Sequence, residues 1–273
     1  MTQEVRPGAA AGLASPPAPG ELASLVAGPL VHRGKVKAVY AVQGRPDLLL
    51  IDFTDDATAF DGKKRASIAG KGEACAAISA RFFEALQRHE VPTHFIGLAG
   101  PARMVVWAVR IIPLEVVVRN RVAGSMARRL GLEEGTALGR PVVEFYYKSD
   151  PLGDPWVLAE HAEALGWATA EELAQMRRLA LAANEAMREL ASAAGLELVD
   201  FKLEFGRRPA DGALLVADEI SPDTCRFWEV QSGERMDKDR FRRDLGKVEE
   251  TYQEVRRRIE EAAAKWRATS RSS

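Results

Sequence analysis

The sequence predicts a globular protein of two lobes in which β-strands and long helices occur together. Its 273 residues are 47% hydrophobic and 28% charged, which is ordinary for a folded protein and too apolar for a disordered one. Because single hydrophobic cores stop growing at roughly 250–300 residues, a chain of this length favours two lobes. Runs of β-branched residues and stretches of helical periodicity both occur along it, which indicates a mixed architecture.

Charge and cysteine content exclude several classes of protein. Lys and Arg number 38 and Asp and Glu number 39, so the formal net charge is −1 and no global basic field attracts nucleic acid. The two cysteines, Cys75 and Cys225, lie far apart and outside any CxxC motif, which makes a disulfide framework implausible. We therefore expect a cytoplasmic protein with no nucleic-acid partner, and buried thiols without a catalytic role.

The beginning of the chain is expected to lie outside the fold. Residues 7–20 form the longest stretch without a charge and consist mostly of Ala, Gly and Pro. This stretch is shorter than the roughly 20 apolar residues of a membrane span, and it lacks the features of a secretory or transit peptide. We expect residues 1–22 to form a disordered tail, and we expect neither a membrane-spanning helix nor a membrane partner.

The first half of the chain contains strand signals around one helix. An apolar run over 48–53 predicts a buried strand that ends in a polar cluster, and helical spacing predicts a helix over about 72–88. The β-branched runs 104–112 and 114–119 are separated by Pro113, which fits two strands or one bent strand. We place a lobe boundary near Ile112, giving an N-terminal lobe of residues 23–112 and a C-terminal lobe of residues 113–273.

The second half alternates between helices and one hairpin. A short helix from Gly124 with a glycine stop precedes a loop over 148–155, and a long helix covers 170–194. Strands over 196–205 and 213–220 are joined by a connection of about seven residues. A long helix is then expected to start near Asp239, because apolar residues from Phe241 to Trp266 recur three, four or seven positions apart.

The predicted hairpin carries the most informative chemistry. Alternation places Asp200, Lys202 and Glu204 on one face of the first strand, and Asp218 ends the second strand. Clustered carboxylates beside a lysine suit Mg²⁺ bound to nucleotide phosphates. A solvated sheet face with a cross-strand ion pair fits the same pattern equally well, and the register of the two strands is open.

Two further segments have the composition of anion sites. Gly34, Lys35 and Lys37 form a loop and strand start able to hold a polyphosphate, although an exposed edge strand fits the same residues, and no Walker or GxGxxG motif occurs. Arg119 at a strand end precedes Ser125 at a helix start, which suits phosphate or carboxylate but equally a surface ion-pair network. Arg226 directly follows the carboxylate strand. The four histidines lack metal-ligand spacing and are expected at the surface or at helix ends.

These segments closely resemble the SAICAR synthetase family, the phosphoribosylaminoimidazole-succinocarboxamide synthases of purine biosynthesis. The resemblance extends over about residues 28–262, in motifs that keep one order and matching separations. The motifs are GKVKAVY at 34–40, DDATAFDG at 55–62, IIPLEVVVRN at 111–120, AGSM at 123–126, EFYYKSD at 144–150, VDFKLEFG at 199–206, ADEISPDTCR at 217–226 and MDKDRFR at 236–242.

The resemblance implies an ATP-dependent amide ligase that joins the carboxylate of carboxyaminoimidazole ribonucleotide to the amino group of L-aspartate. ADP and phosphate are the other products, and an acyl phosphate is the implied intermediate. The implied fold is α+β, with a small β-rich N-terminal lobe like that of protein kinases, a larger ATP-grasp-like lobe and a cleft between them. A homodimer is implied by analogy alone.

The same resemblance assigns roles to residues. ATP is assigned to Gly34, Lys35 and Lys37 and to the backbone of Arg110, Ile111 and Ile112, and Mg²⁺ to Glu204 and Asp218. Catalysis is assigned to Lys202, beside the transferred phosphoryl group, and to Asp200. The substrates are assigned to Arg119, Ser125, Lys148, Asp150, Asp154 and Arg226.

Two departures from the family pattern leave alternatives open. Cys75-Ala76 stands where relatives commonly carry two Asn residues, and Trp107-Ala108 stands where they carry two Lys residues. A paralogue that ligates another carboxylate and amine is one alternative, and a non-catalytic nucleotide-binding protein is the other. The complete set of charged candidates argues against the second, since such groups are costly to hold together without a function.

Overall fold

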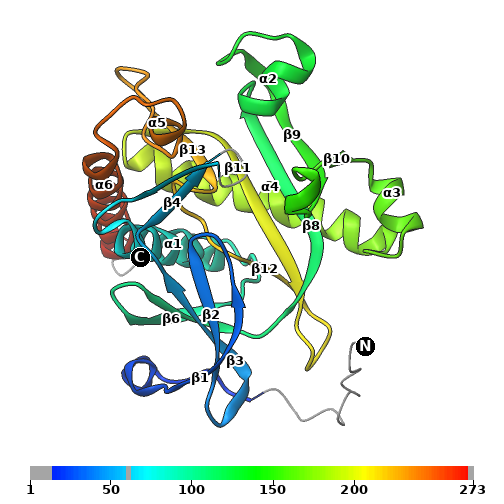
Figure 1. Cartoon of the computed structure of the whole chain (residues 1–273), viewed down its shortest axis with the longest axis vertical. Helices are drawn as coiled ribbons and strands as arrows, with labels where there is room; N and C mark the ends of the chain where they lie inside the picture. Colours follow the sequence, from blue (N-terminus) through cyan, green and yellow to red (C-terminus); the bar gives the residue numbers. More distant parts are fainter. Residues whose placement is uncertain (1–13, 60–62, 270–273) are drawn as a thin grey trace.

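The computed structural model describes residues 14–59 and 63–269 (Figure 1). Residues 1–13 of the expected tail, and residues 60–62 at the end of one family motif, lie outside the described residues. The 3₁₀ helix η1 (Pro19–Ser24) places Leu22 in a small apolar cluster with Leu48, Leu50 and Val105. Leu22, which the sequence analysis placed in the tail, is therefore buried against the first sheet.

An antiparallel sheet forms the N-terminal part, in the strand order β1-β2-β3-β7-β6. The expected strand over 48–53 is confirmed as part of β3. A separate hairpin, β4 with β5, follows it. The bounds are β1 (Ala27–Arg33), β2 (Lys37–Val42), β3 (Arg45–Phe53), β4 (Asp56–Ala59), β5 (Lys64–Ser67), β6 (Phe95–Gly100) and β7 (Arg103–Trp107).

A second antiparallel sheet has the order β10-β9-β8-β11-β12, with β13 also paired to β11. The predicted hairpin is confirmed, and its register sets Glu204 opposite Ala217. The bounds are β8 (Arg110–Arg121), β9 (Ala137–Tyr147), β10 (Trp156–Val157), β11 (Leu196–Arg207), β12 (Leu214–Ala217) and β13 (Cys225–Glu229). The strand expected through residue 220 is shorter, since Asp218 leaves the extended conformation at φ 66°.

The helices confirm most of the predicted helical segments. The bounds are α1 (Lys71–Arg88), α2 (Gly124–Leu130), α3 (Ala159–Ala164), α4 (Ala170–Ala193), α5 (Asp239–Arg242) and α6 (Val248–Thr269), with the 3₁₀ helix η2 (Asp150–Leu152). Thr169 starts α4 with a capping box, accepting the backbone N–H of Glu172 at 3.2 Å while the Glu172 carboxylate accepts that of Thr169 at 2.8 Å. None of the described helices is long and apolar enough to cross a membrane.

The hydrophobic core is continuous across both sheets. α1 packs against α4 and α6, α4 lies against β8, β9 and β11, and α1 also contacts β3, β6 and β7 (Figure 1). Phe82, Phe201 and Phe205 are almost fully buried in this core, and each contributes about 1.5–3 kcal/mol by burial. α4 covers one face of the second, six-stranded sheet, which we call the large sheet. The polar side chains of its strands therefore gather on the opposite face.

The start of α1 explains one family motif. The carboxylate of Asp55 accepts the backbone N–H groups of Gly70 at 3.2 Å and Gly72 at 2.9 Å. A Cβ at Gly72 would lie only 2.8 Å from the carbonyl oxygen of Phe53. The motif therefore holds the end of β3 against the first turn of α1, and only glycine fits that contact.

One expectation about element boundaries needs correction. The break between the β-branched runs falls at residues 108–109 and not at Pro113, which lies inside β8. Pro113 is tolerated there because β9 pairs with β8 only from Leu114 onward. Ile112, where the sequence suggests a lobe boundary, consequently lies within the first strand of the large sheet; the division into lobes stays a prediction.

The helix expected from Asp239 is interrupted. α5 ends at Arg242, and Asp244, Gly246 and Lys247 have positive φ before α6 begins. Phe241 packs with the β4–β5 hairpin, and Arg240 donates to the carbonyl oxygen of Gly246 at 2.8 Å. These tertiary contacts outweigh the helical spacing of the apolar residues.

Candidate active site

One face of the large sheet carries charged side chains from neighbouring strands. Asp200, Lys202 and Glu204 share this face of β11, as alternation predicted. The register sets Asp200 opposite Arg119 of β8, and Glu204 opposite Glu115. Charged groups from separate parts of the chain thus form a continuous surface, whose two ends differ in composition.

Lysines and carboxylates meet at the Glu204 end, and we call them the lysine–carboxylate cluster. Its members are Lys37, Glu115, Lys148, Lys202, Glu204, Asp218 and Glu219. The Lys202 Nζ lies 2.9 Å from Glu204 and 3.0 Å from Glu115. It also lies 3.4 Å from Asp218. Lys202 therefore contacts both residues, Glu204 and Asp218, to which the family resemblance assigns Mg²⁺.

The other two lysines enter the cluster from outside β11. Lys148, directly after β9, places its Nζ 2.5 Å from Glu204. Lys37, at the start of β2 in the small sheet, contacts Asp218 and lies 2.8 Å from Glu219. The cluster therefore connects the two sheets through ion pairs.

Burial and opposite charges set the protonation states here. Burial lowers the pKa of Lys202, but the negative charges of Glu204, Asp218 and Glu115 raise it by more than burial lowers it. The pKa of Lys202 therefore lies well above the ordinary value. Burial raises the pKa of Asp218, but Lys37 and Lys202 more than offset this, so its pKa lies far below the ordinary value. Burial raises the pKa of Glu115, which Lys202 offsets only in part. Lys202 and Asp218 are therefore both charged at neutral pH.

The cluster suits a divalent cation only together with a phosphate ligand. No group of three His, Cys, Asp or Glu side chains among the described residues is arranged to hold a metal ion by itself. Glu204 and Asp218 nevertheless contact the same ammonium nitrogen of Lys202, so their oxygens converge. Because Mg²⁺ usually takes one or two carboxylates and completes its shell with phosphates and water, these two residues fit that donor set.

Arginines dominate the Asp200 end, and we call this group the arginine cluster. Its members are Arg119, Ser125, Arg129, Glu144, Tyr146, Asp200, Arg226 and Asp239. Arg119 donates to Glu144 at 2.5 Å and to Asp200 at 2.9 Å. Its Nη2 donates to the Ser125 hydroxyl at 2.8 Å and to Tyr146 at 3.0 Å. Arg119 is buried and fully hydrogen-bonded, so it is rigidly held.

Arg226 leaves one donor for a ligand. Its Nη1 donates to Asp200 at 2.9 Å and its Nε to Asp239 at 3.0 Å, whereas Nη2 has no hydrogen-bond partner among the described residues. A Cβ at Gly124 would lie 2.6 Å from this Nη2, and Gly124 has φ 56°. The helix start at Ser125 therefore lies close to the guanidinium group because residue 124 is glycine.

The remaining candidate residues lie around the lysine–carboxylate cluster. Lys35 pairs with the exposed Asp150 at 2.9 Å, which links the Gly34 loop to the loop after β9. Asp154 accepts the backbone N–H of Ser149 at 2.8 Å and so shapes its own loop. At the start of β8, Arg110 and Ile111 are exposed and Ile112 is fully buried, so any nucleotide contact of Ile112 is made by its backbone.

Several site residues were missed by the sequence analysis. Glu115 contacts Lys202, and Glu144 and Tyr146 hold Arg119. The alternation of Glu115 with Arg119 in a β-branched run is the signal that predicts a charged strand face there. His94 was expected at the surface or at a helix end, but it lies between α1 and β6 and is 3% exposed. Its Nε2 donates to the backbone carbonyl of Asp218 at 3.1 Å. Burial lowers the pKa of His94 to about 4.

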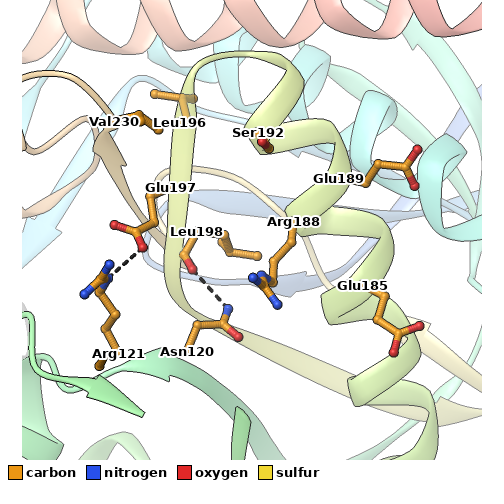
Figure 2. Close-up of a pocket in the computed structure, with 11 residues that line it drawn as sticks. Asn120, Arg121, Glu185, Arg188, Glu189, Ser192, Leu196, Glu197, Leu198 and Val230 are labelled. Atoms are coloured by element: carbon orange, nitrogen blue, oxygen red, sulfur yellow. Dashed lines mark hydrogen bonds and ion pairs between the residues drawn. The ribbon is translucent and has the colours of Figure 1, made fainter. Parts of the chain in front are cut away.

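A polar cavity of about 810 Å³ lies outside both clusters, beside α4 and the start of β11 (Figure 2). Arg121 pairs with Glu197 at 2.6 Å, and Asn120 donates to the carbonyl oxygen of Leu198 at 3.0 Å. Arg188 and Glu185 of α4 line the other side. None of the candidate residues lines this cavity, so we place the candidate active site at the two clusters.

The buried thiols behave as expected. Cys75 and Cys225 are buried and free. Burial raises the pKa of both thiols above the ordinary value, which disfavours the reactive thiolate. The departure at Cys75-Ala76 therefore adds no nucleophile.

An α+β fold of this kind, with clusters of lysines, carboxylates and arginines on one sheet face, suits the class of enzymes that bind several anionic groups at once. The family model described as SAICAR synthetase matches residues 30–259. The chain belongs to this family.

Relatives and solved structures agree with this assignment. The phosphoribosylaminoimidazole-succinocarboxamide synthase of Brevibacillus brevis is 53% identical over 229 residues, covering 84% of this chain and 95% of that protein. That of Magnetococcus marinus is 50% identical over 233 residues, covering 85% and 96%. The crystal structure of the enzyme from Ehrlichia chaffeensis superposes with a TM-score of 0.82 at 40% identity, covering 85% and 98%. A SAICAR synthetase in complex with ADP has a TM-score of 0.80 at 46% identity, covering 84% and 96%.

Proposed function

We propose that the lysine–carboxylate cluster binds Mg-ATP and that the arginine cluster binds the phosphate of a ribonucleotide, on one face of one sheet. The enzyme is an ATP-dependent ligase of purine biosynthesis that joins carboxyaminoimidazole ribonucleotide to L-aspartate. One observation supports this assignment of sites: both clusters include residues of β11, and Asp200 of one lies four residues before Glu204 of the other. This spacing corresponds to about 13 Å of strand, which is comparable to the length of a ribonucleotide.

The nucleotide site is proposed at the junction of the two sheets. Lys35 and Lys37 follow Gly34 and face the phosphates, and an ADP complex of a relative supports nucleotide binding in this fold. β9 does not pair with β8 before Leu114, so the backbone at Arg110–Ile112 has an open edge for the adenine. In this proposal the two sheets together bind one nucleotide, and each contacts a different end of it.

We assign Mg²⁺ to Glu204 and Asp218, the two carboxylates beside the Lys202 ammonium to which the family resemblance gives this role. Glu115 also contacts this ammonium. The cation would supply charge neutralisation for the transferred phosphoryl group. When phosphates bind, the ammonium groups of Lys37 and Lys202 gain new anionic partners, and carboxylate oxygens become available to the metal. Before the ligand binds, the ion pairs within the cluster therefore hold the lysine ammonium groups and the carboxylates in place.

The proposed reaction has two displacement steps. A carboxylate oxygen of the ribonucleotide attacks the γ-phosphorus, the bond to ADP breaks, and an acyl phosphate forms. The aspartate amine then attacks the carbonyl carbon, the C–O bond to phosphate breaks, and the amine loses a proton. Lys202 stabilises charge on the transferred phosphoryl group by its position within the cluster.

Arg119, Ser125 and Arg226 are proposed to form the site of the ribonucleotide phosphate. Ser125 and Arg226 donate to it, whereas Arg119, whose N–H groups all have partners within the protein, contributes its charge and holds Ser125. Asp200 contacts both arginines, so its proposed role is to position their guanidinium groups and not to transfer a proton. Lys148, Asp150 and Asp154 are proposed to face the substrates from the loop after β9, where Lys148 already reaches Glu204.

Two wider proposals concern the cellular setting and assembly. The free thiols of Cys75 and Cys225 support a reducing compartment, and we place the enzyme in the cytoplasm. The homodimer implied by the family resemblance stays a prediction, which sedimentation of the purified protein tests.

The reaction is tested by ADP release from purified protein supplied with Mg-ATP, the ribonucleotide and L-aspartate, omitting each substrate in turn. We expect release only with all three, together with the succinocarboxamide product. Release that is independent of aspartate or of the ribonucleotide would instead support a paralogue with another substrate, and would direct attention to Cys75-Ala76 and Trp107-Ala108. The absence of ADP release under every condition would support a non-catalytic nucleotide-binding protein.

A further inference from the structure

We propose that His94 is a positioning residue that fixes Asp218 for nucleotide binding by hydrogen bonding to its backbone carbonyl. The inference rests on the proposed role of Asp218 in the Mg-ATP site. His94 lies between α1 and β6, whereas Asp218 directly follows β12 in the large sheet. The hydrogen bond therefore joins a proposed ligand-binding residue to a distant part of the chain.

The backbone at Asp218 needs such support. Its φ of 66° lies in the left-handed region, which L-residues other than glycine adopt only at an energetic cost. An extended conformation, as in the preceding strand β12, would redirect the side chain. The left-handed turn lets the carboxylate contact Lys37 and Lys202 while the carbonyl oxygen accepts from His94.

The segment that carries His94 is itself held against β12. The Val216 N–H donates to the carbonyl oxygen of Pro92 at 2.9 Å, and the His94 N–H donates to that of Val216 at 2.8 Å. His94 Nε2 lies 3.1 Å from the carbonyl oxygen of Asp218. Because a carbonyl oxygen only accepts, Nε2 carries the hydrogen. The imidazole thus continues the pairing of the two segments for two residues beyond Val216.

The imidazole has little freedom to choose another partner. His94 is 3% exposed, and its ring centroid lies 5.4 Å from that of Phe83, at an interplanar angle of 59°. Beyond Asp218, the Ser79 hydroxyl contacts both the N–H and the carbonyl oxygen of Ile220, at 3.2 and 3.1 Å. Side chains from α1 and from the segment after it therefore hold the turn on both sides of Asp218 and Glu219.

The test compares three substitutions of one side chain. His94→Leu fills the same space without a donor, His94→Asn carries a shorter amide, and His94→Gln keeps an amide donor of greater reach. We expect the leucine and asparagine variants to raise the Mg-ATP concentration for half-maximal turnover about ten- to a hundredfold, as loss of a supporting partner of a metal ligand does. The glutamine variant should remain within about threefold of the wild type. His89→Gln, which changes a histidine that pairs with Glu189 outside the site, is the matched control.

A double-mutant cycle separates this inference from the proposed site. Asp218→Asn should itself raise the half-saturating Mg-ATP concentration, and His94→Leu should add little in that background because both changes act through one residue. Wild-type half-saturation in both the leucine and asparagine variants, or equal impairment of all three His94 variants, overturns the positioning role. Unchanged half-saturation in Asp218→Asn overturns the proposed metal assignment instead. Should the leucine variant not fold, the asparagine and glutamine pair decides between these outcomes.

Discussion

At the residue scale, the charged groups of the site stabilise one another before any ligand binds. Asp200 lies between Arg119 and Arg226, and Glu204 lies between Lys148 and Lys202. Breaking a buried pair by removing one partner is costly because the other charge remains buried. Substitutions that keep shape but remove charge or one hydrogen bond are therefore the informative ones.

Glu204→Gln tests the metal assignment. We expect turnover to fall more than about a hundredfold and the half-saturating Mg²⁺ concentration to rise, because a neutral amide is a poor ligand for this cation. The circular dichroism spectrum should remain that of the folded protein. Glu197→Gln, on the same strand but paired with Arg121 outside the clusters, serves as the control. Turnover of Glu204→Gln within threefold of wild type would exclude Glu204 as a metal ligand.

Ser125→Ala tests the arginine cluster. The hydroxyl accepts from Arg119 at 2.8 Å and is proposed to donate to the ribonucleotide phosphate. Loss of a hydrogen bond to a charged group costs about 1.5 kcal/mol or more, so the KM for the ribonucleotide should rise about tenfold while kcat and the KM for ATP change little. Ser232→Ala, which removes a contact to Glu229 at the surface, is the control. An unchanged ribonucleotide KM would contradict the assignment.

At the element scale, the path from β8 into α2 determines how close the helix start lies to Arg226. Gly124 enters α2 with positive φ, and Gly131 ends it with φ 65°. Both glycines adopt the left-handed backbone conformation, but only a Cβ at residue 124 would clash with the guanidinium group of Arg226. The two positions therefore separate backbone strain from effects on the site.

Gly124→Ala and Gly131→Ala form a matched pair. Each places alanine at positive φ and should lower stability by about 1–2 kcal/mol, measured by chemical denaturation. Only Gly124→Ala should also displace Arg226 and raise the ribonucleotide KM, by about tenfold or more. Equal effects of the two substitutions on KM would show that α2 does not present the phosphate site.

At the scale of the whole molecule, a buried ion pair joins elements far apart in the sequence. Lys71 at the start of α1 lies 2.7 Å from Asp223, which follows β12, and Tyr252 of α6 donates to the same carboxylate at 2.6 Å. Lys238 lies 3.7 Å away. Burial raises the pKa of Asp223, but Lys238 and Lys71 more than offset this, so its pKa lies below the ordinary value.

The stability of the protein should therefore depend on this carboxylate at acid pH. Because the folded-state pKa is below the unfolded value of about 4, Asp223 contributes stability that is present above pH 4 and is lost as the pH falls below it. Asp223→Asn should lower the free energy of unfolding at pH 7 by about 3–5 kcal/mol, since two lysines remain buried without their partner, and should flatten the acid limb of a stability–pH curve. Asp211→Asn, which removes a surface pair with Arg208, should lower the free energy of unfolding by no more than about 1 kcal/mol and leave the acid limb close to that of the wild type. An acid limb of Asp223→Asn parallel to that of the wild type would contradict this account.

The sequence by itself determined several of the longer elements and the types of residue at the site. Alternation on β11 placed Asp200, Lys202 and Glu204 together, and helical periodicity located α1 and α4, because these patterns reflect local backbone geometry. Local rules failed where tertiary contacts dominate. The helix break after Arg242 depends on the packing of Phe241, and the burial of His94 depends on β12.

Only the tertiary structure decided which charges meet. The register that sets Glu204 opposite Glu115, and the approach of Lys37 from the small sheet to Asp218, join residues from strands that are distant in the sequence. Such pairings depend on the packing of the whole core, because a strand's pattern of side chains is compatible with several registers. The sequence therefore predicts the groups that we propose bind anions, and the fold arranges them into two clusters on one face of the sheet.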